Sequence, residues 1–274
     1  MTEHRFETHS PVKLYVEIGK GNVHVFATET TESTVQVTGR DADQVHVEQT
    51  GDQISVVAPR QRTGFLTGDS SLRVDVVVPL DSDVAIKTGS ADVQLEGAAG
   101  SAQIRSGSGD VRVDALGGQA VIETGSGDIQ LDDARAELRV KSGSGDVKVG
   151  HAASAVSVST GSGDVEIGST NGPAVVKTGS GDLRVIDAQT DVSMVTGSGD
   201  LVVGTASRGK FTMKGASGDV RIGIPAGVPV WTDISTVSGE IRSSLQGAGE
   251  PQAGADHVEL RAKTVSGDVI LTEV

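Results

Sequence analysis

The sequence is dominated by a short motif, Gly-Ser-Gly-Asp, that returns at a fixed interval of 18 residues through the middle of the chain. A constant interval of this length is typical of a solenoid, in which every repeat is one structural unit stacked on the next. After the regular stretch, the intervals lengthen and Glu240 stands once in the place of the aspartate. The aspartates that we align in this way are Asp92, Asp110, Asp128, Asp146, Asp164, Asp182, Asp200, Asp219 and Asp268.

Apolar and polar residues alternate on both sides of the motif. The first and third residues after the aspartate are apolar, as in Val147 and Val149, whereas the second is mostly charged, as in Lys148. A second alternating run lies ten and twelve residues after the aspartate, as in Leu138 and Val140. Each repeat therefore predicts two short strands, each with one buried face. The predicted fold is all-β, a parallel β-solenoid and more specifically a right-handed β-helix, with two short strands per 18-residue coil.

A left-handed helix of hexapeptide repeats also has 18 residues per coil, so it is the alternative to exclude. It requires an apolar residue at every sixth position. Here one six-residue series passes through the aspartate of the motif, and another passes through Gly117 and Arg135. Both series fail, and the two-strand coil is the better interpretation.

The regularity of the repeat divides the chain into three continuous stretches. We expect residues 1–86 to form irregular β coils and a cap that continue into the solenoid. Residues 87–222 should form the regular coils. Residues 223–274 should form irregular C-terminal coils and a second cap. No aromatic residue occurs between Phe65 and Phe211. Because aromatic rings bury so much area in ordinary cores, their absence predicts a thin interior of aliphatic residues and threonine.

Charge and composition exclude several classes of partner. The formal net charge of −14 disfavours binding to nucleic acid, and no run of basic residues offers a phosphate footprint. The absence of cysteine excludes disulfides and thiolate metal sites. No apolar run approaches ~18 residues and the N-terminus lacks the apolar core of a leader. As it stands, the sequence predicts a cytoplasmic chain with no integral membrane segment.

The aligned aspartates form a ladder, because equivalent residues of successive coils lie ~4.8 Å apart. Carboxylates at that spacing repel one another, so each must have a compensating partner. The favoured interpretation is structural: each aspartate accepts hydrogen bonds from the amides of the corner. The alternative is calcium, since the motif resembles the calcium-binding glycine–aspartate nonapeptide. That motif returns every nine residues and spaces its glycines differently, so we assign no metal to the ladder.

Other candidate residues have structural interpretations that we prefer. The Ser or Thr fourteen residues after each aspartate, such as Thr160, shares its parity with the buried positions and should point inward. Trp231 is expected to pack over the C-terminal coils, with a stacking platform for sugar as the alternative. The histidines lack a metal-ligand spacing, and no nucleophile–base pair, P-loop or dinucleotide fingerprint occurs. We therefore predict no catalytic residue and no cofactor.

The segment Leu72–Pro79, which leads into Ile86–Ser90 and then into serial Thr-Gly-Ser-Gly-Asp-Val units, resembles a bacterial family of β-strand-repeat proteins. The members of this family are adhesin-like proteins of unknown function. The resemblance covers nearly the whole chain. It implies a β-helical fold and, in some members, association with the cell envelope, and it supplies no catalytic residues.

We expect a non-enzymatic structural or interaction protein, a rigid β-helical rod that presents repeat surfaces to a protein or glycan partner. The alternatives are a calcium-binding repeat protein and a carbohydrate-active β-helix enzyme. Such enzymes need long loops that bring acids and bases together. Only residues 223–257 offer room for loops of that kind. The partner and the oligomeric state are not fixed by the sequence.

Overall fold

The computed structural model describes residues 1–59, 71–246 and 256–274. Phe65 and most of the Gly/Pro-rich stretch at 246–255 lie outside the described residues, as does part of the region that could hold enzyme loops. Apart from one 3₁₀ turn, η1 (Ala42–Gln44), the described regular structure consists of β-strands. The chain divides into two compact units, residues 1–137 and 138–274. Each unit is described by itself.

Each unit contains two sheets, which we name by their place in the repeat. The leading sheet holds the strands that precede the Gly-Asp corner, and the trailing sheet holds the strands that follow it. In the first unit, the order of hydrogen-bonded neighbours in the leading sheet is β5 (His46–Thr50), β6 (Gln53–Val57), β2 (Lys13–Ile18), β8 (Asp83–Thr88), β10 (Ala102–Ser106), β12 (Ala120–Thr124). The order in the trailing sheet is β1 (Thr2–Glu7), β4 (Glu32–Gly39), β7 (Leu72–Pro79), β3 (Gly21–Thr28), β9 (Asp92–Ala99), β11 (Val111–Leu116), β13 (Ile129–Ala134).

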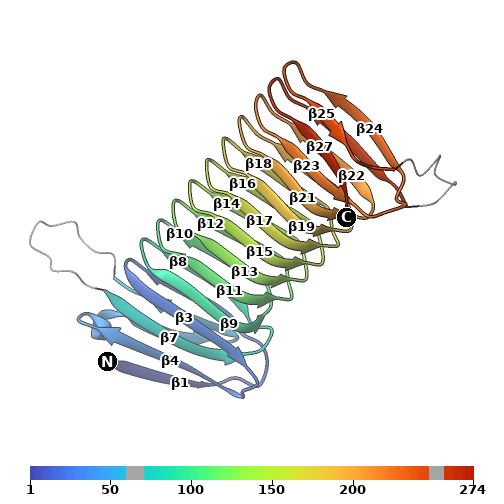
Figure 1. Cartoon of the computed structure of the whole chain (residues 1–274). Coiled ribbons are helices and arrows are strands. Elements are labelled where there is room, and N and C mark those ends of the chain that lie inside the picture. Colours follow the sequence, from blue (N-terminus) through green and yellow to red (C-terminus); the bar gives the residue numbers. More distant parts are fainter. Residues whose placement is uncertain (60–70, 247–255) are drawn as a thin grey trace, which may run out of the picture. The chain divides into compact units, whose positions relative to one another are not determined.

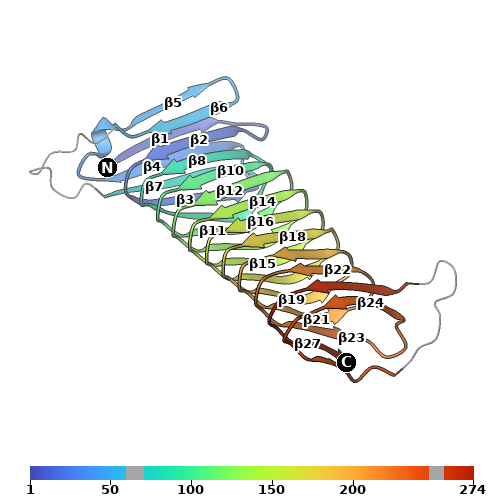
Figure 2. The same cartoon turned by 90° about the horizontal axis from the view of Figure 1, so that it is seen from above.

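The second unit repeats this arrangement, as Figure 1 and Figure 2 show. Its leading sheet has the order β14 (Leu138–Ser142), β16 (Val156–Thr160), β18 (Ala174–Thr178), β20 (Val192–Val195), β22 (Gly209–Lys214), β26 (Val258–Lys263), β24 (Val230–Ser235). Its trailing sheet has the order β15 (Val147–Ala152), β17 (Val165–Thr170), β19 (Leu183–Ala188), β21 (Leu201–Ala206), β23 (Val220–Ile224), β27 (Val269–Glu273), β25 (Ile241–Ser243).

Residues one repeat apart are direct partners in the regular coils. Val111 pairs with Ile129 in the first unit, and Val165 pairs with Leu183 in the second; both pairings are parallel. The apolar side chains of both sheets point inward, and the inward residues of the regular coils are almost fully buried. The prediction of a parallel β-solenoid with two strands per 18-residue coil is thereby confirmed. The interior is mostly aliphatic as expected, and Phe211 is buried on β22. The handedness stays a prediction, as do the divisions at residues 86 and 222.

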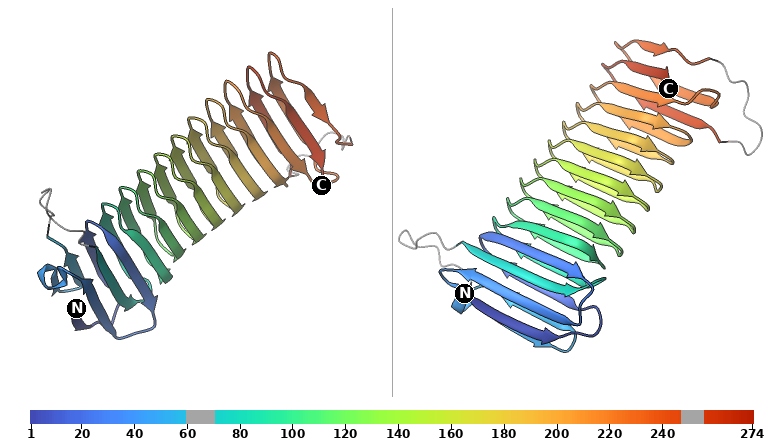
Figure 3. Two further views of the ribbon diagram at one scale, coloured as in Figure 1. Left: turned by 60° about the vertical axis from the view of Figure 1, so that its left-hand side comes forward. Right: turned by 60° about the horizontal axis from the view of Figure 1, so that its bottom comes forward.

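Chain order and spatial order differ near both ends of the chain. In the first unit, β7 lies between β4 and β3, so the coil of β6 and β7 is outside the coil of β2 and β3. In the second unit, the last coil in the sequence, β26 and β27, lies between the coil of β22 and β23 and the coil of β24 and β25. Figure 3 shows successive coils of each unit side by side. The coil that contains Glu240 is therefore outermost in its unit.

The two outermost regions are built differently. In the first unit, β4 runs antiparallel to β7, β1 runs antiparallel to β4, and β5 runs antiparallel to β6. In the second unit, β24 pairs with β26 and β25 pairs with β27, and neither has a further partner among the described residues. No helix of sufficient length and hydropathy to cross a membrane occurs in residues 1–59, 71–246 and 256–274.

Candidate functional site

The corner of each coil explains why the motif has its residue types. At Gly163, a side-chain Cβ would lie 2.1 Å from the carbonyl oxygen of Gly145 in the preceding coil, so only glycine fits. The Gly163 N–H donates to the buried hydroxyl of Thr160 at 3.1 Å. The N–H of Asp164 donates to the carboxylate of Asp146 at 2.8 Å. The glycine is thus required by close approach of two backbones, and the aspartate links each coil to the one before it.

The aspartate ladder repeats this last hydrogen bond along both units. An amide N–H at the motif position donates to the carboxylate of the preceding rung, over distances of 2.7 to 3.0 Å. Neighbouring carboxylates repel by about 1 kcal/mol at the dielectric of water, and a charge-assisted hydrogen bond offsets a cost of this size. The donor–acceptor pairs are Asp110–Asp92 and Asp128–Asp110 in the first unit, and Asp164–Asp146, Asp182–Asp164, Asp200–Asp182, Asp219–Asp200, Asp268–Asp219 and Glu240–Asp268 in the second.

The ladder follows the spatial order of the coils. Asp268 therefore lies next to Asp219, and Glu240 comes after it. The corner-forming role of these aspartates stays a prediction. Within the part of the chain that the structure describes, no group of three or more His, Asp or Glu side chains is placed to hold a metal ion.

The hydroxyl that stands fourteen residues after each aspartate lies inside, as predicted. Ser106, Thr124 and Thr160 are buried, and each accepts the N–H of the second glycine of the motif at 2.9 to 3.1 Å. Ser142 uses its hydroxyl in the other direction and donates to the Gly145 carbonyl at 2.8 Å. These side chains close the corner from within and are not available to a ligand.

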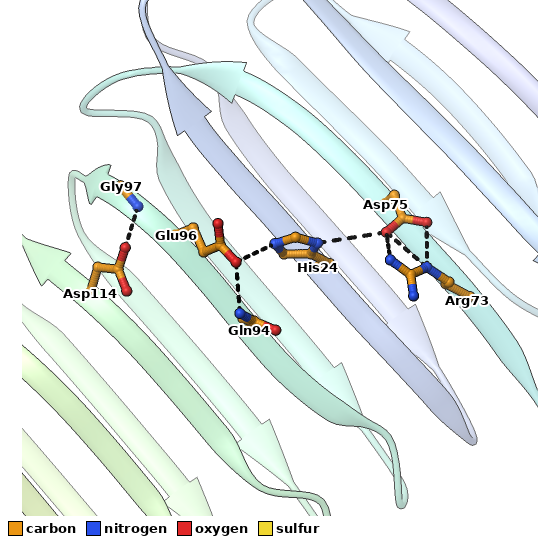
Figure 4. Close-up of polar contacts among 7 residues, drawn as sticks. All are labelled: His24, Arg73, Asp75, Gln94, Glu96, Gly97 and Asp114. Carbon is orange, nitrogen blue, oxygen red and sulfur yellow. Dashed lines mark hydrogen bonds and ion pairs between the residues drawn. The ribbon is translucent and has the colours of Figure 1, made fainter.

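A polar network crosses the outer face of the trailing sheet in the first unit (Figure 4). His24 on β3 lies between Glu96 on β9, with Nε2 3.1 Å from Oε1, and Asp75 on β7, with Nδ1 3.7 Å from Oδ1. Asp75 is also held by Arg73 at 2.8 Å, and Glu96 accepts the Gln94 amide at 2.7 Å. Each carboxylate thus already has partners within the network, which joins three neighbouring strands.

The outer face of the leading sheet in the first unit carries paired charges. Lys87 lies 3.1 Å from Glu17 on the neighbouring strand, and Arg105 lies 3.1 Å from Glu123. At the end of the same face, Lys13 contacts Asp52 at 2.9 Å. The hydrogen bond from Lys13 lowers the pKa of Asp52 and raises the pKa of the lysine itself. This face is electrically balanced.

The same face in the second unit is basic. Lys214 on β22 and Lys263 on β26 are direct partners in the sheet, and both are exposed. Neither has an ion pair or side-chain hydrogen bond to another described residue, although like charges in this position repel. The cross-strand row that contains them holds no carboxylate in this unit; its members are Lys141, Ser159, Lys177, Val195, Lys214, Lys263 and Ser235.

Beside these lysines the face contains a hollow of about 300 Å³. Its charged lining residues are Lys210, Lys214, Arg261 and Lys263, with one carboxylate, Asp233. Lys210 and Arg261 share Glu259, at 3.5 and 2.5 Å. We name this region the basic hollow.

Trp231 on β24 contacts Arg261, which is one of the residues that line the basic hollow. Trp231 is 50% exposed, and the Arg261 guanidinium lies 5.4 Å from the centre of its ring. The indole is not part of the core, and the expectation that it packs over the C-terminal coils stays a prediction. The indole lies on the outer face because its strand neighbours Val230 and Thr232 have the inward parity.

Two lysines of the basic hollow occupy the same position within the repeat, although they do not form a basic run in the sequence. Lys177, Lys214 and Lys263 each stand five residues before an aspartate of the ladder, in different coils. Stacking brings them into one row although they are far apart in the sequence. A count of charges by position within the repeat would have found the row.

The chain matches one family model and is similar to several solved structures. A model of the family described as Toastrack DUF4097 matches residues 12–171 and 137–272. A "putative adhesin" from Parabacteroides merdae is 10% identical, with 100% of this chain and 95% of the other covered and a TM-score of 0.42. A second, from Bacteroides fragilis, is 11% identical over 98% and 96%, with a TM-score of 0.38. A "putative lipid binding protein" from Parabacteroides distasonis is 13% identical over 100% and 96%, with a TM-score of 0.36. No curated protein matches the chain.

Proposed function

The chain belongs to the Toastrack DUF4097 family, and on that premise we propose that it is a non-enzymatic scaffold that binds a partner at the cell envelope. The partner is engaged through the outward rows of side chains on the solenoid coils. The resemblance of the repeat to envelope-associated proteins supports the place of action. The geometry of the rows supports the mode of action.

The observation that carries the proposal is the register of the outward rows. In the trailing sheet of the second unit, Lys148, Glu166 and Arg184 occupy the same place on successive strands. Lys148 and Glu166 are in contact at 3.0 Å. Strand pairing fixes such rows at ~4.8 Å per coil, and inward neighbours such as Val149 and Ile167 anchor them because they are fully buried. A fixed, repeated row of side chains suits an extended partner better than a single small substrate.

The proposal is tested by sedimentation. The purified full chain is mixed with isolated bacterial envelope fragments and spun, and the chain is quantified in pellet and supernatant. We expect it in the pellet only when envelopes are present. Recovery in the supernatant in both cases would favour the cytoplasmic chain that the sequence predicts and would overturn the proposal.

The control variant is Val147→Asp, which places a charge in the interior and should prevent cooperative folding. Its failure to bind would show that envelope binding needs the folded coils. The same supernatants are assayed for soluble sugar released from the envelopes. Time-dependent release of sugar would replace the scaffold with a carbohydrate-active enzyme.

A further inference from the structure

The basic hollow on the leading sheet of the second unit has unpaired cations that the fold of the sheet does not require. We propose that it binds the acidic groups of an anionic polysaccharide. This inference rests on the proposed function and deepens it by naming the ligand class. The carboxylate or sulfate of one sugar sits between Lys214 and Lys263, with Arg261 and Lys210 on the other side.

The hollow has a positive charge, opposite in sign to that of the chain. The chain as a whole carries a formal net charge of −14, yet four cations and one carboxylate line this single hollow. Lys214 and Lys263 are direct partners across β22 and β26 and have no anion within the described structure. An incoming acid group between them would replace repulsion with two attractions. Such a gain is available only where the cations are not already paired.

The matched face of the first unit shows that the coil does not require unpaired cations. There, five residues before the aspartate, Arg105 is followed on the next strand by Glu123, at 3.1 Å. The second unit has Lys214 followed by Lys263 at the equivalent place. Both units form the same two-strand coils. The unpaired lysines are therefore a property of the surface and not of the fold.

The size of the basic hollow and its uncharged and acidic lining residues favour a saccharide as the ligand. About 300 Å³ is at the small end of ligand pockets, and it accommodates one acid group with part of its sugar ring. The hydroxyl of Thr212 and the carboxylate of Asp233 line the same hollow and can bond sugar hydroxyls. The half-exposed indole of Trp231 contacts Arg261 of the lining. A nucleic-acid duplex or an anionic bilayer presents charge over a much wider area, which the net charge of the chain repels.

The row of lysines gives the ligand a direction. Lys177, Lys214 and Lys263 occupy the same position on β18, β22 and β26, with Val195 on β20 between the first two. Successive strands lie ~4.8 Å apart. A linear polyanion that crosses the strands can therefore place a second acid group at Lys177. We expect affinity to increase with oligosaccharide length until this lysine is reached.

The single tryptophan of the chain makes the test direct. The intrinsic fluorescence of Trp231 in the full chain is titrated with oligogalacturonate, dextran sulfate and neutral dextran in low-salt buffer. We expect a saturable change with the two anionic glycans and none with neutral dextran. Replacing both Lys214→Gln and Lys263→Gln should weaken binding by about tenfold or more, the equivalent of 1.4 kcal/mol.

The matched control is Lys87→Gln with Arg105→Gln, which removes the same charge from the paired face of the first unit. Its affinity should equal that of the unsubstituted chain, and circular dichroism should show that both double variants are folded. Equal weakening in both variants would reduce the effect to net charge and overturn the proposal. So would tighter binding of single-stranded DNA or of vesicles of anionic lipid than of either glycan. Saturation by inorganic sulfate at the same concentrations would overturn it as well.

The inference and the proposed function fail in different ways. If the chain sediments with envelopes but binds no anionic glycan, the scaffold stands and the basic hollow has another use. If the Lys214→Gln, Lys263→Gln variant loses glycan binding and also leaves the envelope pellet, the hollow is the contact that holds the chain there. If the chain never sediments, the scaffold fails whatever the glycan titration gives.

Discussion

The leading sheets of the two units are built on the same coil but carry opposite kinds of surface. In the first unit, Lys87 and Arg105 each have a carboxylate neighbour at 3.1 Å. In the second unit, Lys214 and Lys263 face each other and have none among the described residues. The inward residues of the regular coils in both sheets are mostly aliphatic and are buried. The interior and the corner therefore determine the fold, whereas the outward side chains can differ between coils without changing it.

The largest loss of stability should come from replacing a corner glycine, and it should be similar in the two units. Replacing Gly127 or Gly181 by alanine puts a Cβ 2.1 Å from a backbone oxygen of the preceding coil. Neither backbone can move without disturbing the stack, so we expect a loss of about 3 kcal/mol in the free energy of unfolding. Urea denaturation measures it.

The controls for this experiment are Ser126→Ala and Ser180→Ala, because these exposed serines lie next to the glycines. Each should change stability by less than about 0.5 kcal/mol. A large loss in one unit and a small loss in the other would show that the corner is not the shared element. The two units could then not be treated as the same coil with different surfaces.

An intermediate loss in the free energy of unfolding should come from replacing an aspartate of the ladder. Replacing Asp110 or Asp182 by alanine removes the acceptor for an amide of the next coil, at 3.0 and 2.8 Å. We expect a loss of about 1 to 2 kcal/mol in each unit, because the amide loses a charge-assisted bond. Asparagine at the same positions keeps a carbonyl acceptor and should recover part of this loss. An increase in stability on replacement by alanine would mean that carboxylate repulsion outweighs the hydrogen bonds.

The sequence predicts the coil well because each coil repeats a local pattern. The alternation around Val147 and the spacing of the aspartates are sufficient to derive two strands, a corner and in-register stacking. The order of the coils at the ends is not predictable in this way. Nothing in the repeat around Asp268 indicates that its coil lies inside that of Glu240. The basic hollow was missed for a related reason: its residues meet only after β26 is placed beside β22.

A smaller change in stability should follow when an ion pair is introduced on the basic face and one is removed from the balanced face. Replacing Lys214 by glutamate gives Lys263 a partner like that of Arg105, and it should stabilise the chain by about 0.5 kcal/mol. Replacing Glu123 by lysine creates a like-charge pair in the first unit and should destabilise it by a similar amount. Thermal unfolding at low salt measures both changes. Their disappearance at 1 M salt would identify them as electrostatic.

The smallest effect concerns the pair at the end of the balanced face. The hydrogen bond from Lys13 lowers the pKa of Asp52 in the folded chain. The contribution of this pair is therefore fully present above the ordinary aspartate pKa of about 4, and it is lost as the pH falls through the lower folded value. Lys13→Gln should lower the melting temperature slightly at neutral pH and leave it unchanged in strong acid. The control is Lys214→Gln, because Lys214 has no carboxylate partner among the described residues. The difference in melting temperature between this variant and the unsubstituted chain should not disappear in strong acid. If it disappears for both variants, the acid effect does not come from the Lys13–Asp52 pair, and the two faces do not differ in pairing.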